Sequence, residues 1–242
     1  TGREATAYYF LAEIHSRSGQ HGHAFEAATN SRQAFKKIGN VREEVSMMQW
    51  MVMMKVAMAE DAQVQGEGWR SIRRVYTAAL KLAKEMLGIA SKYTQSRAPK
   101  ILAHQTVAHV MCLLMRYDEA LRHVEAALKL CRETAKGSTE ERESKVRRAE
   151  SLLMMVLIHR WQGKDMKEVE PILKEAMQCV QEAEDYDLLA EVMAIAETLD
   201  EPKAAASDSR TATPAEGRYN RAADSPSYSI TRASRYAGPE AE

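Results

Sequence analysis

The sequence lacks the features that mark membrane, secreted and nucleic-acid-binding proteins. Its 34 basic side chains are balanced by 34 acidic ones, so it has no excess charge to attract nucleic acid or an anionic membrane. The longest nearly apolar run, residues 45–59, is too short to span a bilayer and carries Lys55 in its middle. No basic segment followed by an apolar stretch marks a secretory signal near Thr1, although a chain that begins without Met is processed or part of a longer one. We therefore expect a cytoplasmic protein with no membrane or nucleic-acid partner.

Cysteine is scarce, and the common catalytic motifs are missing. Cys112, Cys131 and Cys179 each lie within an apolar, helix-like pattern, and an odd number without close spacing favours neither a disulfide framework nor a zinc site. We interpret them as buried, reduced thiols. The sequence has no glycine-rich phosphate loop, no His-Glu-x-x-His and no Gly-x-Ser-x-Gly. We expect a protein that is not an enzyme, with no catalytic residues, no cofactor and no metal.

Two regions differ in composition. Residues 1–199 are rich in good helix formers, whereas residues 200–242 hold four prolines and a single large aliphatic, Ile230. The second region cannot bury enough apolar surface to offset the entropy of ordering, so we predict a disordered tail. In the first region apolar residues recur with helical spacing, and glycine and proline residues interrupt this pattern at intervals. We predict helices at 3–17, 22–37, 41–61, 68–87, 99–115, 118–135, 140–162, 166–184 and 186–199.

The second helix of each predicted pair repeats with a long period. Ala24, Ile72, Ala120 and Val169 occupy equivalent places, separated by 48, 48 and 49 residues. Seven residues further on, the equivalent side chains are small: Ser31, Ala79, Ala127 and Ala176. A small residue at a fixed place lets a neighbouring helix approach closely, as a stack of helix pairs requires.

Two of these helices resemble the second helix of a tetratricopeptide repeat. The first match is Arg116-Tyr117-Asp118-Glu119-Ala120-Leu121 followed by Ala127-Leu128, and the second is Lys167-Glu168-Val169-Glu170-Pro171-Ile172-Leu173 followed by Ala176-Met177. The place of Pro171 is similar to the kinesin-light-chain variety of the repeat. The chain departs from the family in its period, since the simple repeat has about 34 residues. It also has Ala12, Ala57 or Ala108 where the family has a glycine.

The resemblance implies an all-α fold, a right-handed solenoid of about four helix pairs and a capping helix in residues 1–199. It also implies a non-catalytic scaffold that holds a protein or peptide partner in a concave, largely apolar groove lined by the first helix of each pair. In the family's register the lining residues are Tyr9, Glu13, Met54, Met58, Gln105, His109, Met154 and Ile158. The alternative is a structural segment of a longer solenoid, which stacks on further repeats upstream or self-associates through an apolar end face.

The helix predicted at 41–61 is unusually rich in methionine. Met47, Met51, Met54 and Met58 follow one another at helical spacing, and other apolar residues cover much of the remaining surface. A helix that is apolar nearly all round is buried on most sides, and methionine also lines adaptable peptide grooves. For Met54 and Met58 both interpretations stay open, because the resemblance turns them toward the groove.

Three other clusters favour ordinary structural roles. His21 and His23 flank Gly22 without further ligands nearby, and His109 and Cys112 lie one turn apart without a second pair. We therefore predict a solvated loop and a packed face respectively. The predicted helix 68–87 carries five cations, which could grip phosphates but are more typical of a solvated helix face: Arg70, Arg73, Arg74, Lys81 and Lys84.

Overall fold

The chain folds into a row of antiparallel α-helices in a computed structural model that describes residues 1–134, 137 and 140–200. In that part of the chain there are nine helices and no strand, as predicted. Their bounds are α1 Gly2–Arg17, α2 His21–Lys37, α3 Val41–Val64, α4 Trp69–Tyr93, α5 Ala98–Leu113, α6 Tyr117–Arg132, α7 Glu141–Trp161, α8 Met166–Ala183 and α9 Tyr186–Asp200. The predicted disordered tail is residues 200–242; Asp200 ends α9, and residues 201–242 lie outside the described residues.

Glycines at the predicted joints end helices and reverse the chain. Gly19 has φ +70° and Gly39 has φ +74°, a left-handed conformation that side chains with a Cβ adopt only at a cost. Polar side chains begin the next helices: Asn40 accepts a hydrogen bond from the Glu43 amide at 3.2 Å, and Thr1 forms a capping box with Glu4. Joints of three or four residues then make α1 and α2, and likewise α3 and α4, antiparallel neighbours.

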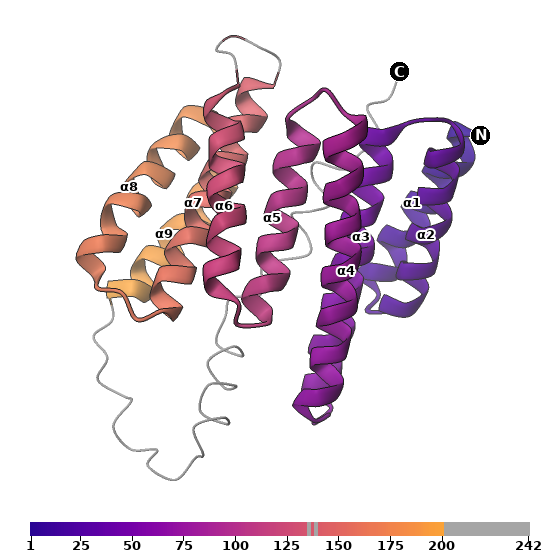
Figure 1. The fold of residues 1–242 in the computed structure, drawn as a ribbon, viewed down its shortest axis with the longest axis horizontal. Coiled ribbons are helices and arrows are strands. Elements are labelled where there is room, and N and C mark those ends of the chain that lie inside the picture. Colours follow the sequence, from indigo (N-terminus) through magenta and orange to yellow (C-terminus); the bar gives the residue numbers. More distant parts are fainter. Residues whose placement is uncertain (135–136, 138–139, 201–242) are drawn as a thin grey trace.

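The helix α4 continues beyond residue 87, where we predicted its end, and includes Gly88. This glycine is exposed, lies within the helix and has open space around its Cα. A glycine costs a helix about 1 kcal/mol relative to alanine, and burial of Met86 and Ala90 on either side of it holds the helix together. The helices α3 and α4 are the two longest, with 24 and 25 residues, and the end at which they are joined extends beyond the neighbouring pairs in Figure 1.

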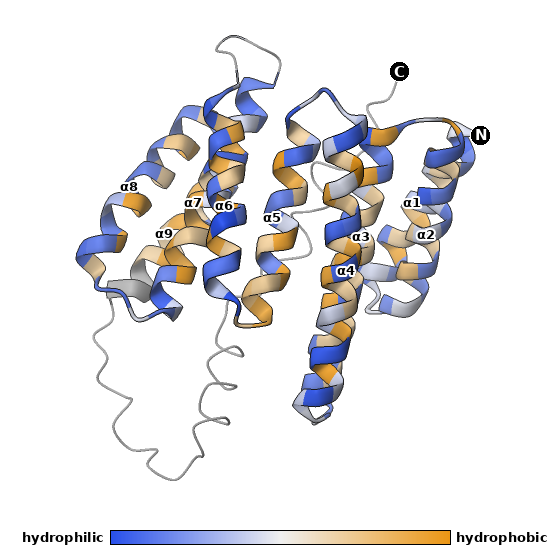
Figure 2. Cartoon of the chain, viewed as in Figure 1, coloured by the Kyte–Doolittle hydropathy of each residue, from blue (hydrophilic) through white to orange (hydrophobic). Residues whose placement is uncertain are grey.

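The pairs stack side by side to form a helical repeat solenoid (Figure 1). Each helix packs on the next one in sequence, and among the first helices α5 also contacts both α3 and α7. Apolar and polar residues alternate along the helices, seen as orange and blue segments of the ribbon in Figure 2, and most of the buried residues are apolar. None of the helices in the described residues is both long and apolar enough to cross a membrane.

The predicted repeat register is confirmed by burial. The four residues at the first repeat position and the four at the second are all completely inaccessible to solvent: Ala24, Ile72, Ala120, Val169, Ser31, Ala79, Ala127 and Ala176. In the first pair the small residue is Ser31, whose hydroxyl donates to the carbonyl of Ala5 in α1 at 2.8 Å. The alanines that replace the family's glycine, Ala12, Ala57 and Ala108, are also buried. Small side chains therefore set how closely the helices approach.

The close approach at Ala79 leads to a direct test. We expect Ala79→Leu to lower the free energy of unfolding by about 1–3 kcal/mol, because the added carbons have no room between the helices. Its neighbour Ala78 is exposed on the same helix, so Ala78→Leu is the matched control and should change stability by less than about 0.5 kcal/mol. Urea denaturation followed by circular dichroism measures both. Equal shifts of the two midpoints would show that α4 packs in a different register.

Candidate partner-binding surface

The structure places most of the predicted groove residues inside the protein. Tyr9, Met54, Gln105, Met154 and Ile158 are buried, while Glu13, Met58 and His109 are half-buried. The five buried positions face neighbouring helices instead of lining an open channel. The continuous apolar strip that the resemblance implied for these positions is therefore not exposed.

The packing of Met54 and Tyr9 explains why the apolar strip is not exposed. Met54 has no exposed surface and belongs to a core shared by α1, α2 and α3. Tyr9 of α1 packs edge-to-face on Trp50 of α3, with ring centroids 6.0 Å apart, so the first helices meet each other directly. The interpretation of Met54 as a core residue is confirmed, and its place on an open strip with Met58 is wrong.

Gln105 belongs to a buried polar network between α5 and α7. Its side-chain amide donates to the carbonyl of Arg147 at 2.8 Å and to the hydroxyl of Ser151 at 3.0 Å. The guanidinium of Arg147 lies 3.1 Å from the carboxylate of Glu150, and both side chains are only 10% exposed. A buried charge pair with these hydrogen bonds fixes how α7 sits on α5.

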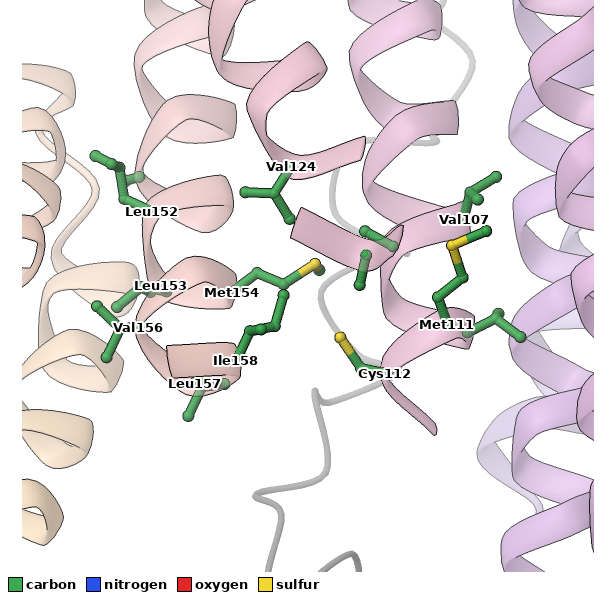
Figure 3. Packing of buried hydrophobic residues seen from close by; sticks show 14 of the residues in the cluster. Val107, Met111, Cys112, Val124, Leu152, Leu153, Met154, Val156, Leu157 and Ile158 are labelled. Carbon is green, nitrogen blue, oxygen red and sulfur yellow. The ribbon is translucent and has the colours of Figure 1, made fainter. Parts of the chain in front are cut away.

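Met154 and Ile158 also lie between first helices. Both project from α7 toward α5, where Cys112 and Met111 belong to the same apolar cluster (Figure 3). Desolvation lowers the pKa of His109 to about 4, so this imidazole is neutral at pH 7. Burial raises the pKa of the Cys112 thiol to about 12. A neutral imidazole and a protonated thiol fit the packed face that we predicted.

Met58 lies at an open pocket of about 510 Å³. The pocket is formed by the joint between α1 and α2, the first turn of α2, the last turns of α3 and the joint that follows it. Its lining residues are Gly19, Gln20, His21, Gly22, His23, Glu26, Met58, Asp61, Ala62, Gln65 and Glu67. A Cβ on Gly22 would lie 3.7 Å from the Met58 methyl carbon, so the absent side chain keeps the pocket open above Met58.

The charges around this pocket are mostly acidic. Asp61 comes near the end of α3, where no basic side chain balances the negative end of the helix dipole. Burial, together with the charge of Asp61, raises the pKa of the neighbouring Glu60. The Nε2 of His21 is 3.5 Å from a carboxylate oxygen of Asp61, while the buried Nδ1 of His21 has no hydrogen-bond partner among the described residues. The pocket thus combines the apolar side chains of Met58 and Ala62 with carboxylates that can pair with a cation.

A histidine pair that the sequence analysis did not identify joins α5 and α6. The Nδ1 atoms of His104 and His123 are 3.0 Å apart. Desolvation, with a smaller effect of His123, lowers the pKa of His104 to about 4, and desolvation also lowers the pKa of His123. Both rings are therefore neutral at pH 7, and one donates its N–H to the other. Within the described residues no group of three His, Cys, Asp or Glu side chains is arranged to hold a metal ion.

Comparison with known proteins supports the fold and goes no further. No protein-family model matches the chain, and no curated protein matches its sequence. Among solved structures, the apo form of RapI is similar with a TM-score of 0.56 and 11% identity, over 91% of this chain and 67% of RapI. BtubC (BKLC) from P. vanneervenii is aligned over 99% of this chain and 94% of its own, at 12% identity. Its TM-score of 0.38 is too low to indicate a shared fold. At this identity the likeness to RapI shows the fold alone, a helical repeat solenoid.

Proposed function

We propose that this chain is a non-catalytic, cytoplasmic scaffold of the tetratricopeptide type that binds a protein or peptide partner. The observation that carries the proposal is the open pocket beside Met58 on a stacked-pair solenoid. Architectures of this kind present extended binding surfaces. The three cysteines are buried free thiols, which suits a reducing compartment.

The chemistry of the pocket defines the partner segment that fits it. A lysine or arginine side chain lays its apolar stem along Met58 and Ala62 and brings its cation to Asp61, Glu26 or Glu67. The partner is therefore a segment that presents a basic residue next to apolar ones.

Selection from a random peptide library with the full chain as bait tests the proposal. We expect the enriched peptides to share a lysine or arginine beside an apolar residue, and to bind Met58→Lys at least about tenfold more weakly, because the new cation repels theirs and fills the pocket. Met193, a 48% exposed methionine of α9, provides the matched control. Peptides that bind Met58→Lys and Met193→Lys equally well, or a selection without enrichment, would contradict the proposal.

A second candidate function is supported by the exposed apolar face of α1. Phe10, Leu11 and Ile14 are 51%, 44% and 59% exposed on this terminal helix. A repeat at the end of a solenoid usually has a polar outer face, so this one suits stacking on further repeats or on a second copy. Sedimentation of the chain alone separates the two functions, because stacking on a second copy depends on chain concentration and pocket binding does not.

A further inference from the structure

The helix α4 carries a concentration of positive charge that the balanced composition conceals. It holds six cationic side chains and one carboxylate. At 100° per residue the six cations fall within a stripe about 100° wide, opposite the buried residues Ile72, Ala79 and Ala83. We call this stripe the α4 basic face, and it consists of Arg70, Arg73, Arg74, Lys81, Lys84 and Lys92.

The α4 basic face is not neutralised within the described part of the chain. The helix's carboxylate, Glu85, is already occupied by Arg32 of α2, with a nitrogen-to-oxygen distance of 2.7 Å. The three arginines and Lys81 are exposed and form no ion pair with any residue that the structure describes. Lys84 adds its field to that of Arg122 on α6, and both lower the pKa of Glu119, although Arg116 is the main cause of that shift. The face therefore presents unpaired cations over about 16 Å from Arg70 to Lys81.

This arrangement costs the fold stability. Arg70 and Arg74 are like charges one turn apart, and such a pair destabilises a helix. Arg70 also lies in the first turn of α4, which contains no acidic residue, where the positive end of the helix dipole disfavours a cation. A helix face that only contacts water would carry both positive and negative side chains, and it would avoid this loss of stability.

We propose that the α4 basic face docks an acidic protein segment, a helix or extended peptide with carboxylates at three- to four-residue spacing. Arginine recognises carboxylates with two parallel hydrogen bonds, and half of the cations on this face are arginines. The stripe is one helix wide, and the whole chain including it has no net charge, which favours a narrow acidic segment over a nucleic-acid duplex. Its exposed non-cationic positions are Thr77, Gly88 and Ser91, which lack the apolar bulk that inserts into a membrane.

The test uses the full chain and a labelled helical peptide of about 16 residues, matched in length to the face, with glutamate at every third or fourth position on an alanine background. In fluorescence anisotropy we expect saturable binding that weakens with added salt. Arg70→Glu combined with Arg74→Glu should weaken binding at least about tenfold. The control is Lys167→Glu combined with Lys174→Glu, which makes the same change in net charge at two exposed residues of α8. This control should weaken peptide binding less than about twofold.

Several outcomes would overturn the proposal. They are the absence of measurable peptide binding, equal loss in the two double variants, or tighter binding of a DNA duplex or of vesicles containing phosphatidylserine than of the glutamate peptide. Self-association at low salt that disappears in the arginine variant would identify a second copy as the occupant and would also overturn it. The proposal does not depend on the Met58 pocket, because Met58→Lys should leave binding of the glutamate peptide unchanged.

Discussion

Met54→Lys should lose most of the stability of the protein, whereas Met58→Lys, one helical turn later, should retain it. Met54 is 0% exposed in the core between α1, α2 and α3. A lysine there must either bury its charge or lose its proton, and documented buried lysines have pKa values near 5–6. The cost is on the order of 5 kcal/mol, comparable to the whole stability of a small domain. We expect a greatly lowered urea midpoint, or no helical circular dichroism signal at all.

Two controls make this result specific. Met58 lines the open pocket beside Asp61 and Glu26, so a lysine there stays hydrated and gains carboxylate neighbours. Its effect on stability should remain within about 1 kcal/mol. Met54→Leu preserves volume and polarity and should cost less than about 1.5 kcal/mol. If Met54→Lys were tolerated as well as Met58→Lys, Met54 would be open to solvent, and the apolar strip expected from the family register would be correct after all.

The elements of the fold could be predicted because their signals are local. Glycines end helices at Gly19 and Gly39, and the 48-residue recurrence of small residues identifies the packed face of each second helix. The helix end predicted just before Gly88 is wrong, since α4 continues to Tyr93. An isolated glycine weakens a helix by about as much as a few buried contacts strengthen it, and only the tertiary packing of Met86 and Ala90 decides that α4 continues.

The binding surface could not be predicted as well, because it depends on contacts between first helices that are distant in sequence. The family register correctly identifies the inward-facing side of α3, α5 and α7, but it cannot tell an open groove from a direct helix contact. Gln105 hydrogen-bonds residues more than 40 positions away in α7, and no periodicity encodes that pairing. Conversely, the sequence placed His21 and His23 in a joint, whereas they begin α2 and line the pocket.

Disrupting the Arg147–Glu150 ion pair should have the second large effect on the stability of the protein. Removing the carboxylate in Glu150→Ala takes the nearest printed carboxylate away from the Arg147 guanidinium, which is 10% exposed, and leaves Glu143 at 3.9 Å. An uncompensated buried charge costs about 3–5 kcal/mol, and we expect a decrease near 3 kcal/mol because Glu143 compensates in part. The measurement is again the free energy of unfolding in urea, followed by circular dichroism.

An exposed pair with the same spacing gives the control. Arg116 and Glu119 are also three residues apart, at 2.6 Å, but each is 40% exposed, so Glu119→Ala should cost less than about 1 kcal/mol. Replacing both buried partners, with Arg147→Met and Glu150→Leu, removes the stranded charge and should recover most of the stability lost in Glu150→Ala. Similar losses for Glu150→Ala and Glu119→Ala would mean that water reaches Arg147. In that case the contact between α5 and α7 would be open at Gln105, and the first helices would there leave room for a partner.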